Sequence, residues 1–200
     1  MVIKRKKLIL NTIGIFFIIL GIVAAINTSV KVHPQEFLWF CYFSLIILGV
    51  GVLIRNSFIV SSQVNMLAIP AVIWIVDFAY VLFTKKSFFG ITNYFFERGD
   101  ILSKIITLQH FITVPLAIFC IFLIGYKRKD SWKLSFVYIS LMFFISRLFA
   151  SSTRNVNCVY KFCGNISFNP VLYPFAWFVI LFLMVIATNL ILNKFLIKKS

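Results

Sequence analysis

Three ionisable residues lie inside long apolar stretches of this sequence, where each side chain has to find a partner. Asp77, His110 and Arg147 interrupt three different stretches. An ionisable group in lipid is costly, so each one is a candidate for a functional site. A carboxylate can accept a proton or orient a base, a histidine titrates near neutral pH, and a guanidinium can hold an anion. We therefore predict Asp77 and His110 as catalytic or proton-handling residues and Arg147 as a ligand-binding residue.

A run of polar residues from Ser151 to Cys158 follows the stretch that carries Arg147. Arg154 offers a planar guanidinium for a carboxylate or a phosphate, and Asn155 and Asn157 offer amide donors and acceptors. We predict ligand-binding roles for these three residues and for His33, which precedes Pro34 in another loop. The alternative is that both loops are ordinary solvated or interfacial loops.

The four cysteines give no metal motif. Cys158 and Cys163 lie five positions apart, a spacing that permits a disulfide if their loop folds back. Cys41 and Cys120 lie in apolar stretches and are expected to be small buried hydrophobes. The sequence has no CxxC motif, no Cys/His cluster and only two histidines. We therefore predict no metal site and no cofactor.

The composition places these residues in a membrane. Of 200 residues, 62% are hydrophobic and 12% are charged, whereas soluble domains are roughly half apolar and about a quarter charged. This excludes a cytosolic enzyme and a disordered chain. The net charge is +15, but the basic residues form short runs between apolar stretches. Such runs meet anionic head groups and fix orientation, so the expected partner is a lipid bilayer and not nucleic acid.

About 20 apolar residues cross a bilayer as a helix, and six stretches qualify: roughly 8–26, 37–54, 66–83, 105–125, 134–150 and 174–192. We predict a single all-α domain, a bundle of about six transmembrane helices. Lysine and arginine are concentrated at the helix ends on one side, so both termini are expected to be cytoplasmic. The outer loops are then about 27–36, 84–104 and 151–173.

In this topology Asp77, His110 and Arg147 all fall in the outer half of the bilayer. Around His110, small and polar residues recur at steps of three and four, among them Ser103, Thr107 and Ala117, and such stripes face other helices. We therefore expect the three ionisable side chains to enclose a polar pocket. The alternatives are an ion pair between Asp77 and Arg147 and a hydrogen-bonded interhelical His110.

Several short motifs resemble those of small polytopic bacterial inner-membrane proteins over most of the chain. They are His33-Pro34 ahead of Trp39, Arg55-Asn56-Ser57, Trp74 to Asp77, His110, and Arg154-Asn155-Val156-Asn157. The resemblance implies an integral, multi-pass protein of a bacterial inner membrane and implies no activity.

The leading functional hypothesis is an outward-facing polar pocket that binds a small molecule or a lipid head group, with transport as its extension. The first alternative is an intramembrane enzyme that acts on a lipid-borne substrate with His110 as acid or base. The second is a structural or assembly subunit. Because the chain is small for a stand-alone transporter, a homo-oligomer or a larger membrane complex is also expected.

Overall fold

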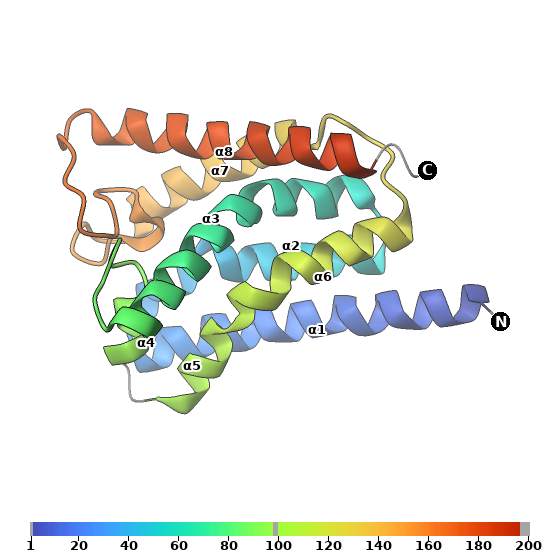
Figure 1. The fold of residues 1–200 in the computed structure, drawn as a ribbon, viewed down its shortest axis with the longest axis horizontal. Coiled ribbons are helices and arrows are strands. Elements are labelled where there is room, and N and C mark those ends of the chain that lie inside the picture. The colour runs from blue at the N-terminus through green and yellow to red at the C-terminus, as the bar shows by residue number, and fades with distance from the viewer. Residues whose placement is uncertain (1, 98–99, 197–200) are drawn as a thin grey trace.

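The computed structural model describes residues 2–97 and 100–196, and within these ranges the chain is helical with no strand (Figure 1). The helices, in chain order, are α1 (Val2–Lys31), the 3-10 helix η1 (Pro34–Leu38), α2 (Phe40–Leu53), α3 (Ser57–Thr84), α4 (Asn93–Glu97), α5 (Ile101–Thr107), α6 (Gln109–Ile124), α7 (Ser131–Phe149), the 3-10 helix η2 (Val156–Cys158) and α8 (Tyr173–Leu196).

Five segments of the described chain are long and apolar enough to cross a membrane. They are Ile3–Lys31, Ser57–Thr84, Ile101–Ile124, Ser131–Phe149 and Tyr173–Leu196. Each contains most or all of one predicted span, so the protein has the helices of a multi-pass membrane protein. The continuous span predicted at 37–54 is instead divided between η1 and α2. An extended ψ of 122° at Trp39 separates η1 from α2, and α2 has only 14 residues.

The third span was predicted to start at residue 66, whereas α3 starts at Ser57. The prediction missed the first part of the helix because that part contains polar residues. The helix begins at Ser57, where the side chain of Asn56 caps it by accepting from the backbone N–H groups of Phe58 (3.1 Å) and Ile59 (3.3 Å). Gln63 and Asn65 lie in this first part of α3 and are buried. Polar residues that face other helices lower the hydropathy of a segment without ending the helix.

Helix α3 occupies the middle of the bundle and packs against α2, α6, α7 and α8 (Figure 1). Helices α1 and α2 pack closely through glycines. A Cβ atom on Gly49 would lie 2.5 Å from the carbonyl oxygen of Gly14, and one on Gly21 would lie 2.8 Å from that of Tyr42. Small residues therefore let these two backbones approach.

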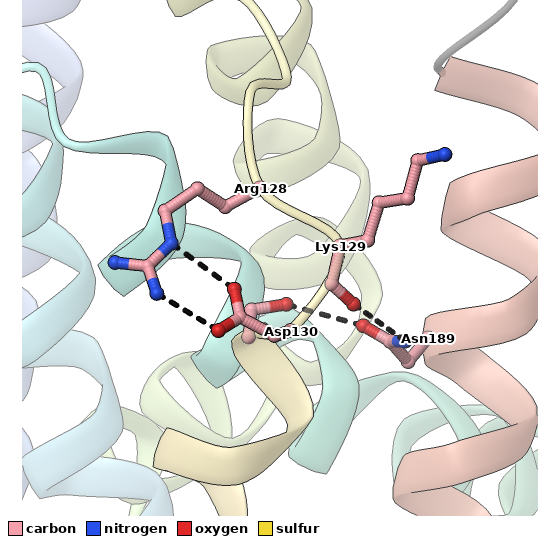
Figure 2. A network of polar contacts seen from close by, with 5 residues as sticks. Arg128, Lys129, Asp130 and Asn189 are labelled. Atoms are coloured by element: carbon pink, nitrogen blue, oxygen red, sulfur yellow. Dashed lines mark hydrogen bonds and ion pairs between the residues drawn. The ribbon is translucent and has the colours of Figure 1, made fainter.

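A polar network joins α3, α7 and α8 at the end of the bundle where α1 begins and α8 ends. Asn65 Nδ2 donates to Ser131 Oγ (3.1 Å) and to Asn189 Oδ1 (3.3 Å). Figure 2 shows Asn189 also donating to the carbonyl of Lys129 (3.1 Å), next to the ion pair of Arg128 with Asp130 (2.8 Å). The network ties the loop before α7 to α8.

We expect Asn189→Ala to lower the free energy of unfolding by about 2 kcal/mol, because Asn189 makes three hydrogen bonds in a buried network. Asn11→Ala is the control: Asn11 accepts from Arg55 at an exposed position, and its loss should cost less than about 0.5 kcal/mol. Equilibrium unfolding in mixed micelles measures both. Equal losses would contradict a stabilising role for the network.

Candidate functional site

A cavity of about 460 Å³ lies in the half of the bundle away from the start of α1 and the end of α8. Its walls come from α1, η1, α2, α3, α4, α5, α6 and η2 and from loop residues between these helices. The apolar lining includes Trp39, Phe40, Leu67, Ala71, Trp74 and Val114. The polar lining includes Thr28, Glu36, Ser103, Thr107, Gln109 and His110. The cavity is therefore mostly apolar, with a few polar groups that can orient a ligand.

A break between two helices positions His110 in this cavity. Helix α5 ends at Thr107 and α6 begins at Gln109. The carbonyl oxygen of Thr107 lies 2.7 Å from His110 Nδ1. Because a carbonyl can only accept, Nδ1 carries the hydrogen, and in the neutral ring Nε2 carries the lone pair. Since His110 lines the cavity, its ring offers the site a hydrogen-bond acceptor and a base.

Trp74 holds the His110 ring in place. The two rings stack with centroids 4.7 Å apart and planes inclined by 16°. The indole N–H of Trp74 donates to the hydroxyl of Tyr94 (3.1 Å). These contacts connect α3, α4 and α6 around one side of the cavity, so the imidazole is held on a rigid wall.

Glu36 is an acidic residue of the site that the sequence prediction did not include. It lies in η1, is 7% exposed and accepts a hydrogen bond from the indole N–H of Trp39. The sequence signal that could have identified Glu36 is the rarity of acidic residues, since the chain has 5 of them against 20 lysines and arginines. Glu36 gives the lining a carboxylate that Asp77 was expected to supply.

Asp77 does not line the cavity, because its carboxylate anchors a loop. It is fully buried and accepts from the N–H groups of Phe89 (2.7 Å), Gly90 (3.3 Å) and Thr92 (2.9 Å) and from the Thr92 hydroxyl (2.7 Å). These bonds fold the loop of residues 85–92 back onto α3. The structure therefore does not bring Asp77 and His110 together as a catalytic pair.

Arg147 and Arg154 also lie outside the cavity lining. The Arg147 guanidinium donates to the carbonyl of Val159 (2.9 and 3.3 Å) and packs over the rings of Phe143 and Tyr160. Arg154 is exposed. The alternative of an Asp77–Arg147 ion pair is not formed either, since both side chains bind loop backbone. Neither arginine is placed to hold a ligand in the cavity.

The two asparagines hold the loop of residues 150–172, which we call the disulfide loop. Asn155 accepts from the N–H groups of Tyr160 (2.9 Å) and Lys161 (3.1 Å). Asn157 accepts from the N–H of Phe40 (2.8 Å), at the start of α2, and donates to the carbonyl of Leu38 (2.9 Å). Both have positive φ, which asparagine tolerates better than most residues. Their amides are thus used by the protein's own backbone.

His33 likewise binds the backbone. Its Nδ1 accepts from the N–H of Gln35 (3.2 Å) and caps η1. His33 therefore positions the short helix that carries Glu36, and it does not line the cavity itself.

Cys158 and Cys163 are joined by a disulfide with their Cα atoms 5.4 Å apart. Both residues line the cavity. The disulfide loop thus forms part of the cavity wall, and the crosslink limits how far this wall can open.

Asp100 positions the other polar wall. It caps α5 by accepting from the N–H (2.9 Å) and the hydroxyl (2.7 Å) of Ser103. These hydrogen bonds, with a smaller contribution from Lys31, hold the pKa of the Asp100 carboxyl below its usual value. Ser103 in turn accepts from Asn27 of α1 (2.8 Å), so α5 is fixed against α1 beside the cavity.

Comparisons of the chain with protein-family models, with curated proteins and with solved structures find no match.

We expect Asp77→Ala to release the loop of residues 85–92, because four donors lose their acceptor. The free energy of opening this loop should fall by about 2–3 kcal/mol, which would speed amide hydrogen exchange at Phe89 and Thr92 roughly a hundredfold. Hydrogen exchange resolved by residue measures this. Asp130→Asn, which removes the acid of an exposed ion pair, is the control. Unchanged exchange at both amides in Asp77→Ala would show that the anchoring role is wrong.

Proposed function

We propose that the protein binds a small molecule in this cavity from the outer side of a bacterial inner membrane, with transport as the extension of that binding. The observation that supports binding is the cavity of about 460 Å³ with an apolar lining and a few inward polar groups. Ligand sites are typically concave, mostly apolar and equipped with a small number of polar groups. A lipid head group is the other ligand of suitable size.

The proposed topology has six crossings with both termini in the cytoplasm. The start of α1 and the end of α8 lie at the same end of the bundle (Figure 1), which requires an even number of crossings. Helix α2, although only 14 residues long, then serves with η1 as the sixth. Basic residues near that end include Lys4, Lys127, Lys129 and Lys194, as cytoplasmic ends require. The cavity then lies in the outer half.

A catalytic role for His110 on a lipid-borne substrate is the second candidate. The contact between Nδ1 and the Thr107 carbonyl leaves Nε2 as the basic nitrogen of a neutral ring at the cavity. This candidate predicts turnover that His110→Ala abolishes while ligand binding persists. The binding proposal requires no turnover.

The binding proposal is tested with 3-phenyl-3-(trifluoromethyl)diazirine, a small neutral aromatic photoprobe, on the protein in maltoside micelles. We expect saturable labelling of cavity-lining residues, mapped by mass spectrometry. Ala71→Trp should remove the saturable part, because Ala71 is buried in the cavity wall and a large ring there fills the space.

Val72→Trp is the matched control. It adds the same ring one position further along α3, where the side chain is 59% exposed and does not line the cavity. Labelling of the lining should survive in this variant. Labelling that never saturates, or that Ala71→Trp leaves intact, would refute binding in the cavity.

A further inference from the structure

We propose that the cavity recognises an organic cation: an ammonium group attached to an aromatic or bulky apolar body. The inference rests on the proposed function and specifies the ligand class. It follows from three features of the lining, namely its charge, the state of Glu36 and the aromatic rings beside Glu36.

The charge of the lining is opposite to that of the chain. The sequence carries a net charge of +15, yet no lysine or arginine of the described residues lines the cavity. Glu36 is the carboxylate of the described lining, which also includes His110. A phosphate or carboxylate ligand would meet no fixed positive charge, so the lining disfavours an anion.

Glu36 is a buried acid without a cationic partner. No ion pair involves it in the part of the chain that the structure describes, where Arg128 and Asp130 form the pair. The Trp39 indole is the group there that donates to its side chain. One neutral hydrogen bond compensates a buried carboxylate poorly, since burying an unpaired charge is expensive. A cation in the cavity would supply the missing charge.

The Trp39 ring lies beside this carboxylate, and Phe40 belongs to the same lining. Trp39 donates to Glu36 and follows it by three positions, and Phe40 comes next in the chain. Both rings line the cavity, and neither stacks on another aromatic ring of the described residues. The faces of aromatic rings attract cations, most strongly for tryptophan. A carboxylate next to such rings is a combination suited to an ammonium group with apolar substituents.

The rest of the lining agrees with this assignment. His110 presents Nε2 as an acceptor in the neutral ring, and the hydroxyl of Thr113 already donates to the side chain of Gln109 (2.7 Å). Leu67, Ala71 and Val114 provide an apolar wall for the body of the ligand. The ammonium group could belong to a free amine or to a zwitterionic lipid head group, since both offer the same charge.

The test compares benzyltrimethylammonium with neopentylbenzene, which has the same shape and no charge, as competitors of the diazirine photolabelling in maltoside micelles. With concentrations corrected for partitioning into micelles, we expect the cation to compete at about tenfold lower concentration, equivalent to 1.4 kcal/mol. Benzylsulfonate, the anion of similar size, should compete least.

Glu36→Gln should abolish the advantage of the cation and leave competition by neopentylbenzene unchanged, since a glutamine can still accept from Trp39. The matched control is Glu97→Gln, which removes the same charge at an exposed position and should preserve the advantage. Trp39→Leu is the second variant and should reduce the advantage by removing the ring. Photolabelling that remains saturable in each variant shows that the cavity is still present.

Equal competition by the cation and its neutral isostere, or an advantage that survives in Glu36→Gln, would overturn the inference. Stronger competition by benzylsulfonate would also overturn it. In all three cases saturable photolabelling would still support binding in the cavity, so the two proposals fail separately. The source of the ammonium group is identified by adding phosphatidylethanolamine to the micelles, with phosphatidylglycerol as the control lipid. If phosphatidylethanolamine alone competes with the photolabelling, the ligand is a lipid head group. If neither lipid competes, the ligand is a free amine.

Discussion

The loops at the end of the bundle away from the start of α1 and the end of α8 depend on hydrogen bonds from a few helix and loop side chains to backbone N–H and C=O groups. Near the apolar part of a membrane, water is scarce, so unpaired backbone groups are costly. Asp77 satisfies three N–H groups of the loop of residues 85–92. Asn155 and Asn157 do the same for the disulfide loop and for the start of α2. These polar side chains replace the water that soluble loops would use.

The cavity lies where these anchored loops meet the start of α2 and the junction of α5 with α6. Helix α2 starts at Phe40, whose N–H donates to Asn157, and residues on both sides of Leu108 line the same cavity. The disulfide-bonded residues Cys158 and Cys163 add a wall to this cavity. The lining therefore comes from segments on either side of each helix boundary.

Hydropathy predicted the long helices well, because the cost of exposing backbone to lipid is a property of each segment alone. It did not predict that η1 is separated from α2 at Trp39, since that break depends on Asn157, far away in the chain. Counting residues along helices also placed Asp77, His110 and Arg147 at one depth. Depth does not determine direction: Asp77 and Arg147 bind loop backbone, whereas His110 faces the cavity. How a loop folds back onto its helix depends on tertiary contacts, and the spacing of residues along the sequence carries no information about those contacts.

The five acidic residues of the chain show why Glu36 differs from the rest. Asp77 accepts four hydrogen bonds from its loop, Asp100 caps α5, and Asp130 pairs with Arg128. Glu97 is exposed, so solvent or head groups can compensate its charge. In each of these cases a partner in the fold or the surroundings accounts for the carboxylate. Glu36 is buried with a single indole donor, and none of the basic residues that the structure describes forms an ion pair with it. The cationic ligand proposed above would supply the charge that the fold does not compensate.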